Sequence, residues 1–127
     1  MRLISLLVTL LIFSGTCVAQ AAYKLETVAE GLNFPWSIAF LPSGDYLVAM
    51  RSGEVRRIST NGDVSEPITG LPDSYVMSQG GYFDITLDPN FVSNQRVYLS
   101  FAHGTADANA TRIVAGRLEG NTVTGVE

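Results

Sequence analysis

The chain contains a weak internal repeat, in which a strand-and-turn pattern occurs twice. In the first copy, Ile-x-Phe-x-Pro at residues 38–42 precedes Tyr-Leu-Val-Ala at residues 46–49. In the second copy, Ile-x-Leu-x-Pro at residues 85–89 precedes Val-Tyr-Leu-Ser at residues 97–100. Repeats of about 40–50 residues that each hold several short strands are typical of β-propeller blades. Because neither one blade nor two can bury both faces, the repeat predicts a fold with further blades.

The sequence after residue 21 indicates an all-β fold. Short runs rich in Val, Ile, Tyr and Phe are separated by Gly, Pro, Asn and Asp. We expect a six-bladed β-propeller, of which about the first two four-stranded blades are present. A two-layer β-sandwich is the competing fold, but a sandwich has no reason to reuse one pattern at a constant offset. The predicted blade strands are Trp36–Phe40, Tyr46–Met50, Glu54–Ser59 and Val64–Pro67, then Tyr82–Leu87, Arg96–Phe101, Thr111–Leu118 and Thr122–Val126.

Three smaller features complete the expected organisation. A further match joins Arg57-Ile58 of the first copy to Arg117-Leu118 of the second. A strand over Leu25–Ala29 precedes the first blade and is expected to close the ring by adding to the last one. Asp88-Pro89-Asn90 predicts a turn after the first strand of the second blade.

The first 21 residues have the order of parts of a secretory signal peptide. Arg2 gives a positive start, Leu3–Phe13 is an almost continuous apolar run, and small residues follow. Cleavage is expected after Ala19 or Ala21, which leaves residues 22–127 as the N-terminal part of the propeller domain. The apolar run is shorter than the roughly 20 residues of a membrane span, so we expect no stable membrane insertion after cleavage.

Charge and cysteine content narrow the location and the partners. Cys17 is the only cysteine, so the exported domain has no disulfide and suits the bacterial periplasm. Lipidation at Cys17 is disfavoured because Ser14 stands where a lipoprotein signal has leucine. The formal net charge is −4 and no cluster of Lys or Arg follows the signal peptide. These features argue against binding to nucleic acid or to an anionic membrane surface.

One candidate functional residue stands before the first strand of the second blade. In a propeller, function lies on loops at one end of the central channel, and Gln79-Gly80-Gly81 leads into that strand. The two glycines permit a sharp turn or a close approach to a ligand, which would present the Gln79 amide at the channel. Alternatively, the glycines only lead into a strand and Gln79 is solvated.

Four motifs in order resemble one family. They are Gly-Leu-x-x-Pro-Trp-Ser-Ile-Ala-Phe-Leu-Pro-x-Gly at residues 31–44, Arg-x-Gly-x-Val-Arg at 51–56, Gln-Gly-Gly-x-x-Asp-Ile-x-Leu-x-Pro-x-Phe at 79–91, and Val-Tyr-Leu-Ser-Phe at 97–101. Together they resemble the soluble PQQ-dependent aldose sugar dehydrogenases, the glucose/sorbosone dehydrogenase group of six-bladed propellers.

The resemblance implies an exported quinoprotein oxidoreductase. Such an enzyme oxidises the anomeric carbon of an aldose to a lactone by hydride transfer to calcium-bound pyrroloquinoline quinone (PQQ), and an external acceptor then takes the electrons. By this resemblance Gln79 lies beside the cofactor and the sugar. The base histidine and most ligands of the quinone and calcium belong to later blades. This segment therefore holds no expected catalytic base or metal ligand, and the 127-residue chain by itself is expected to be inactive.

His103, the only histidine, is expected to be a solvated residue in a loop between the second and third strands of blade two. Two other functions remain open on the sequence. A non-enzymatic propeller of the same architecture would act as a binding module, because a fold does not determine a function. A sugar-lactone hydrolase would need acidic and asparagine metal ligands near the channel, which the two loops before the inner strands do not supply.

Overall fold

A computed structural model of the protein describes residues 23–127. The predicted signal peptide, with Cys17 and both cleavage positions, therefore lies outside the described residues. Within residues 23–127, no helix has the length and apolar character that crossing a membrane requires.

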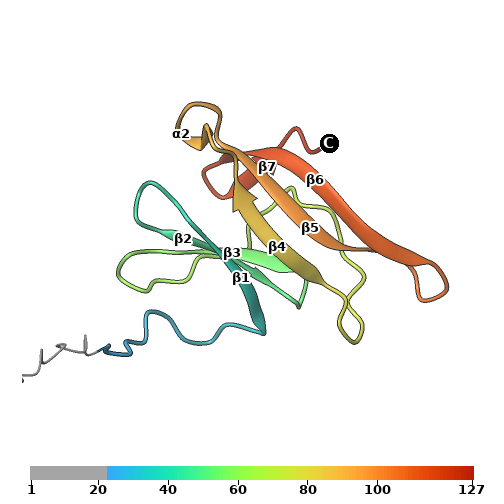
Figure 1. The fold of residues 1–127 in the computed structure, drawn as a ribbon, viewed down its shortest axis with the longest axis horizontal. Helices are drawn as coiled ribbons and strands as arrows, with labels where there is room; N and C mark the ends of the chain where they lie inside the picture. Colours follow the sequence, from blue (N-terminus) through green and yellow to red (C-terminus); the bar gives the residue numbers. More distant parts are fainter. Residues whose placement is uncertain (1–22) are drawn as a thin grey trace, which may run out of the picture.

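The described residues form two antiparallel sheets that lie one against the other (Figure 1). This arrangement confirms the predicted all-β class. The first sheet contains β1 (Pro35–Phe40), β2 (Tyr46–Met50) and β3 (Glu54–Ile58). The second sheet contains β4 (Tyr82–Leu87), β5 (Arg96–Gly104), β6 (Asn109–Glu119) and β7 (Thr122–Thr124). A single helical turn, α2 (Phe91–Asn94), connects β4 to β5.

Strand register confirms the internal repeat in three dimensions. Ile38 lies opposite Val48 in the first sheet, and its counterpart Ile85 lies opposite Leu99 in the second. Both inner strands also carry an irregularity at the same place, between Pro35 and Ser37 in β1 and between Tyr82 and Asp84 in β4. β-bulges are specific features of a strand and do not occur at random positions. A bulge at the equivalent place in both sheets therefore indicates that the two sheets are copies of one structural element.

The proposed match of Arg57-Ile58 to Arg117-Leu118 is wrong by two residues. Ile58 lies opposite Tyr46, whereas the residue opposite Val97, the counterpart of Tyr46, is Gly116. The shift by two keeps the same face of the strand, which is why the sequence pattern looked equivalent.

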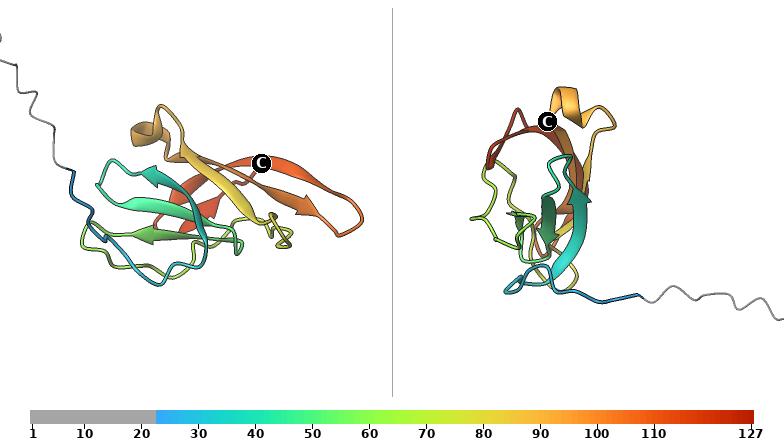
Figure 2. Two further views of the ribbon diagram at one scale, coloured as in Figure 1. Left: turned by 60° about the horizontal axis from the view of Figure 1, so that its bottom comes forward. Right: turned by 90° about the vertical axis from the view of Figure 1, so that its left-hand side faces the viewer.

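The two sheets lie one against the other (Figure 2), and the hydrophobic core contains side chains from both. Each sheet turns alternate side chains into this core, as the period of a strand requires. Full burial of each large apolar side chain stabilises the fold by about 1.5–3 kcal/mol. The core residues on the strands are Ala39, Leu47, Ala49 and Val55 from the first sheet, and Tyr82, Ile85, Val97, Leu99, Phe101, Val114, Leu118 and Val123 from the second.

The predicted fourth strand of the first blade, Val64–Pro67, does not form a strand. Only Val64 makes a bridge, to Ile58. Pro67 has no N–H to donate to a ladder, and the Ser65 hydroxyl accepts the Arg57 N–H at 3.0 Å. The segment therefore follows β3 without regular pairing, and the first sheet has three strands.

Leu25–Ala29, a predicted strand, forms no strand with the described residues. These residues run beside the first sheet without belonging to any strand ladder (Figure 2). Leu25 is 99% exposed, whereas Ala29 packs against the small buried group of Val48, Met50 and Ile58. The last blade, to which this segment is expected to add, lies outside the described residues, so the closing of the ring stays a prediction.

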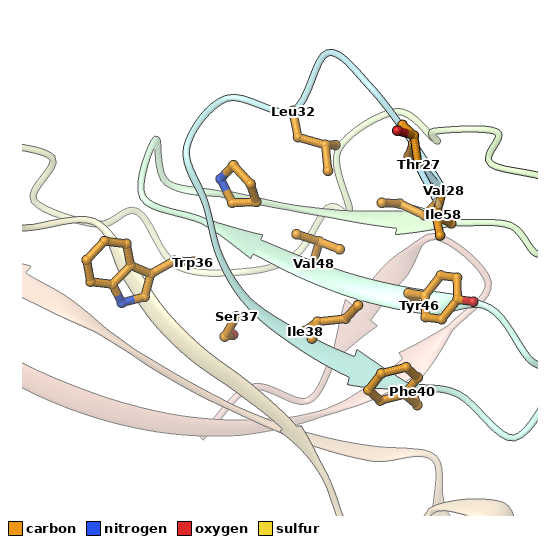
Figure 3. A pocket seen from close by; sticks show the side chains of 12 residues that line it. Thr27, Val28, Leu32, Trp36, Ser37, Ile38, Phe40, Tyr46, Val48 and Ile58 are labelled. Carbon is orange, nitrogen blue, oxygen red and sulfur yellow. The ribbon is translucent and has the colours of Figure 1, made fainter. Parts of the chain in front are cut away.

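The outer face of the first sheet is apolar and open. A groove of about 560 Å³ lies over this face, between the strands and residues 27–32 (Figure 3). Ile38 and Phe40 are 50% and 68% exposed there, whereas Ile85, the counterpart of Ile38, is 3% exposed because the second sheet turns this face onto the first. The first sheet therefore presents to solvent the same face that the second sheet buries.

Asp88 organises the connection from β4 to β5. One carboxylate oxygen accepts the Asn90 N–H at 2.8 Å and the Asn94 amide at 2.9 Å, and the other accepts the Tyr98 hydroxyl at 2.8 Å. The Phe91 N–H also donates to the Asp88 carbonyl at 2.9 Å, which confirms the predicted turn. The hydrogen bonds, that of the Asn90 N–H first, hold the pKa of Asp88 below its ordinary value.

Tyr98→Phe is expected to raise the pKa of Asp88 towards its ordinary value, because one hydrogen bond to the carboxylate is lost. A carboxylate whose pKa is lowered by folding stabilises the protein above its unfolded-state pKa, and this stabilisation disappears as the pH falls through the folded-state pKa. The variant should therefore lose stability at a higher acidic pH than the wild type. Denaturant unfolding measured between pH 2 and pH 7 checks this, and superimposable pH profiles would contradict it.

Candidate functional site

The inner strands of both sheets begin at the same end of the structure. β1 and β4 are preceded by two loops, which we name leading loop 1 (residues 31–34) and leading loop 2 (residues 76–81). Because β2 runs antiparallel to β1, its last residue Met50 lies opposite Pro35, and the β2–β3 turn comes back to this end. Helix α2 lies at the other end of β4 (Figure 1). The two leading loops and the β2–β3 turn therefore form one candidate site.

Leading loop 2 is a tight turn with Gln79 near its tip. The Gly80 N–H donates to the Met77 carbonyl at 2.7 Å, so the turn spans these four residues. Ser78 has φ 54°, in the left-handed region that a residue with a side chain rarely adopts. Strain of this kind costs on the order of 1 kcal/mol and is concentrated at functional sites. The turn leaves Gln79 exposed at the end of the sheet.

The two glycines of leading loop 2 are required by close backbone contacts, that of Gly81 with the first sheet and that of Gly80 with its own segment. Gly81 has φ 126°, and a Cβ there would lie 1.9 Å from the Arg51 carbonyl oxygen. A Cβ on Gly80 would lie 2.4 Å from the Tyr75 carbonyl oxygen. The close approach that the sequence predicted is therefore made to protein backbone, and it sets the position of the Gln79 turn relative to the first sheet.

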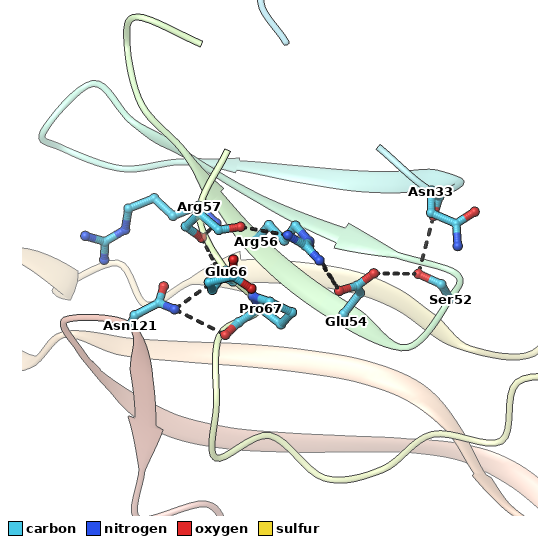
Figure 4. A network of polar contacts seen from close by, with 9 residues as sticks. Asn33, Ser52, Glu54, Arg56, Arg57, Glu66, Pro67 and Asn121 are labelled. Atoms are coloured by element: carbon cyan, nitrogen blue, oxygen red, sulfur yellow. Dashed lines mark hydrogen bonds and ion pairs between the residues drawn. The ribbon is translucent and has the colours of Figure 1, made fainter. Parts of the chain in front are cut away.

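Leading loop 1 is joined to the same β2–β3 turn. The Arg51 N–H donates to the Phe34 carbonyl at 3.0 Å, and the Ser52 hydroxyl donates to the Asn33 carbonyl at 3.4 Å (Figure 4). The Arg51 guanidinium carbon lies 4.5 Å from the centroid of the Phe34 ring, which is a cation–π contact. Phe34 itself has φ 55° and is 60% exposed.

These segments enclose a shallow pocket of about 270 Å³, which we name the Arg51 pocket. Sequence reasoning used Arg51 only as part of a motif and missed the pocket. Its lining residues are Asn33, Phe34, Arg51, Ser52, Val76, Met77 and Ser78.

The positive charge of Arg51 is not neutralised within residues 23–127. No acidic side chain lines the pocket, and Arg51 takes part in none of the described ion pairs. The nearby carboxylate of Glu54 accepts instead from Arg56, with Nη2 at 2.9 Å and Nε at 3.2 Å (Figure 4). The pocket is therefore electropositive.

His103 lies in a strand, which corrects its predicted place in a loop. It is the penultimate residue of β5 and is opposite Ala110, because the β5–β6 hairpin is longer than its sequence pattern indicated. The imidazole is exposed and lies edge-to-face with Phe101 at 6.0 Å between ring centroids. His103 follows Ala102, whose N–H donates to the Gly81 carbonyl at 2.9 Å, so it lies at the end of the second sheet that carries leading loop 2. The described residues offer it no carboxylate partner, and it does not line the pocket described above.

Tyr82, directly after leading loop 2, supports the core and is not exposed for chemistry. Its hydroxyl donates to the Pro72 carbonyl at 2.6 Å, and its ring lies edge-to-face with Phe101 at 6.0 Å. Burial raises the pKa of Tyr82 to about 12, and the negative charge of Asp73 adds to the increase. The phenol therefore stays protonated at physiological pH and serves packing.

Residues 23–127 contain no group of three His, Cys, Asp or Glu side chains placed to hold a metal ion. The site consists of an exposed amide at Gln79 and a guanidinium at Arg51, both neutral or cationic donors. It can bind and orient a polar or anionic ligand, but it has no group that could take up a proton at neutral pH.

The two sheets are blades of a β-propeller, with a polar site on the loops that precede their inner strands. The sequence profile described as glucose/sorbosone dehydrogenase matches residues 32–127. The chain is 35% identical to aldose sugar dehydrogenase YliI of Escherichia coli K12 over 107 residues, 83% of this chain and 29% of that protein. The chain belongs to the glucose/sorbosone dehydrogenase family.

Solved structures agree with the family. The apo form of the soluble aldose sugar dehydrogenase of E. coli superimposes with a TM-score of 0.76 at 33% identity, over 80% of this chain and 30% of that one. The PQQ-bound aldose sugar dehydrogenase of Streptomyces coelicolor superimposes with a TM-score of 0.69 at 31% identity, over 81% of this chain and 31% of that one. The chain therefore spans about 30% of the length of these relatives.

Proposed function

We propose that residues 22–127 form the first two blades of an exported, six-bladed quinoprotein. This enzyme would oxidise the anomeric carbon of an aldose to a lactone by hydride transfer to PQQ. Membership of the family and the likeness to a PQQ-bound relative support this proposal. The signal peptide over residues 1–21, periplasmic export and an external electron acceptor are part of the same proposal.

The open face of the first sheet supports the larger ring. Ile38 and Phe40 occupy the positions that Ile85 and Leu87 use to pack the second blade on the first. By this equivalence, another blade, the last of the ring, would pack on the groove in Figure 3. Contact with such a blade would remove the exposed apolar side chains from water.

The exposure of Gln79 at the tip of a strained turn is the single observation that carries the proposed site. A neutral amide both donates and accepts hydrogen bonds, so it can bind sugar hydroxyls without competing for their protons. We propose that Gln79 orients the aldose beside the cofactor. The proton released in the oxidation would go to a base histidine in a later blade, as in the family that the sequence resembles. His103 has no carboxylate partner among residues 23–127 that would make it such a base.

The residues of the site fit part of a PQQ site. The quinone carries carboxylates and carbonyls, and the exposed Gln79 amide is a neutral donor that suits such a ligand. The basic groups that hold the quinone carboxylates would belong to later blades. When bound, PQQ supplies the two-electron acceptor of the reaction. The described residues offer calcium no ligand cluster, so calcium would be held by other blades.

Sugar-dependent dye reduction by the full-length protein tests the proposed function. With D-glucose as substrate, turnover is expected only when both PQQ and calcium are added back to the stripped protein. The 127-residue chain assayed in the same way should give no turnover. Turnover without quinone would overturn the proposal, whereas glucose binding without turnover under any condition would favour a non-enzymatic binding module.

A further inference from the structure

We propose that the Arg51 pocket binds a carboxylate of the substrate, at the end of the sugar remote from its anomeric carbon. The favoured substrate class is then the acidic aldoses, such as uronic acids. This inference rests on the proposed function for the position of the sugar beside Gln79.

The charge in the pocket is the first argument. Arg51 is half-buried, makes none of the described ion pairs, and stands among side chains that are neutral. The nearest acid in the sequence, Glu54, is occupied by Arg56 at 2.9 Å. A guanidinium in such surroundings lacks a counter-charge, and an anionic group of a ligand would supply it.

The fixed position of the guanidinium is the second argument. Arg51 is held at its backbone by Phe34, at 3.0 Å, and at its head by the Phe34 ring, at 4.5 Å. A planar guanidinium held in place loses less side-chain entropy when it binds a carboxylate through two parallel hydrogen bonds. Arg51 is therefore prepared for a planar anion before the ligand arrives.

The connection to the sugar site is the third argument. Ser78 lines the Arg51 pocket and directly precedes Gln79, so the two residues have Cα atoms about 3.8 Å apart. The Gly81 backbone also touches the Arg51 carbonyl, which couples the position of the pocket to the turn that carries Gln79. A sugar whose anomeric end is bound at Gln79 can thus extend its other end towards Arg51.

Equilibrium binding to the full-length protein tests this inference without any need for turnover. Titration calorimetry at low salt would compare D-glucuronate with D-glucose. In the variant Arg51→Gln, affinity for glucuronate should fall about 10- to 100-fold, the range for hydrogen bonds to a charged group. Affinity for glucose should change less than about 3-fold.

Two further variants separate the specific charge from packing and from general electrostatics. Arg51→Lys keeps the charge but not the planar fork. Its affinity for glucuronate should therefore lie between that of the wild type and that of Arg51→Gln. Arg117→Gln removes the same charge beside Glu119, on the strand that ends far from the leading loops, and should leave both affinities unchanged. Equal losses for glucuronate and glucose in Arg51→Gln would overturn the inference.

The quinone is the other possible source of the carboxylate, and a separate titration distinguishes it. PQQ binding followed by absorbance should be the same in wild type and Arg51→Gln. If the variant weakens PQQ binding and leaves glucuronate binding intact, the pocket belongs to the cofactor and the inference is wrong. If the protein prefers glucuronate through Arg51 but oxidises no sugar, the inference stands and the proposed oxidation fails.

Discussion

Replacing Gly81 with alanine is expected to lower the free energy of unfolding by roughly 3 kcal/mol or more, because a strained backbone and a direct clash occur at one position. The residue has φ 126°, and the added Cβ would lie 1.9 Å from the Arg51 carbonyl oxygen. The Arg51 backbone cannot move away easily, because its N–H donates a hydrogen bond to the Phe34 carbonyl at 3.0 Å. Urea-induced unfolding of the full-length protein measures the change.

Gly120→Ala is the matched control for this loss. Gly120 also has a positive φ, of 60°, but a Cβ there would meet nothing within 4 Å. The control should lose only about 1–2 kcal/mol, the cost of a left-handed conformation for a residue with a side chain. If both variants lost the same stability, the close contact between the second blade and the β2–β3 turn would not exist in solution.

Most of the strands could be predicted because each is bounded by residues that end a strand. The predicted bounds of Tyr46–Met50 and Tyr82–Leu87 match the structure, and turn residues stand on both sides of each. The two copies of the repeat, which the sequence predicted, have equivalent pairings in the structure, Ile38 with Val48 and Ile85 with Leu99. Local signals of this kind come from the residues themselves.

The remaining predicted elements depended on partners that a local pattern does not contain. Val64–Pro67 has strand-like composition, but Pro67 and the Ser65 hydroxyl disturb the ladder with β3. Leu25–Ala29 belongs to no strand ladder among residues 23–127, and its expected partner is the last blade. His103 falls in β5 because the β5–β6 hairpin continues to Gly104 and Asn109, which only the pairing of the two strands reveals.

The site was predictable only in part, for the same reason. Gly80-Gly81 pointed to a special backbone and hence to Gln79, but not to the Arg51 carbonyl that makes Gly81 necessary. Phe34 and Ser78 adopt left-handed conformations without being glycine, so no local signal marks them. The Arg51 pocket joins residues that are far apart in the chain, and only the packing of the two blades brings them together.

Replacing Gln79 with alanine is expected to lower kcat/KM for aldoses roughly 10- to 100-fold in the full-length holoenzyme, which corresponds to the loss of one or two hydrogen bonds to the bound sugar. The free energy of unfolding should hardly change, because the side chain is exposed and makes no hydrogen bond with residues 23–127. Steady-state kinetics with D-glucose, combined with urea unfolding of the same preparation, separates binding from folding. This separation distinguishes Gln79→Ala from Gly81→Ala, which should lose stability first.

Val92→Ala is the matched control for Gln79→Ala. Val92 is 77% exposed on α2, at the end of β4 opposite to the leading loops, so truncation there removes exposed side-chain atoms without reaching the site. Its kcat/KM and its stability should both stay close to those of the wild type. If Gln79→Ala behaved in the same way, the strained turn at Ser78 would serve only the contact between blades. If Gln79→Ala instead lost kcat/KM only in proportion to its loss of stability, Gln79 would be a structural residue. An amide that binds the sugar must lower kcat/KM in a variant that is still folded.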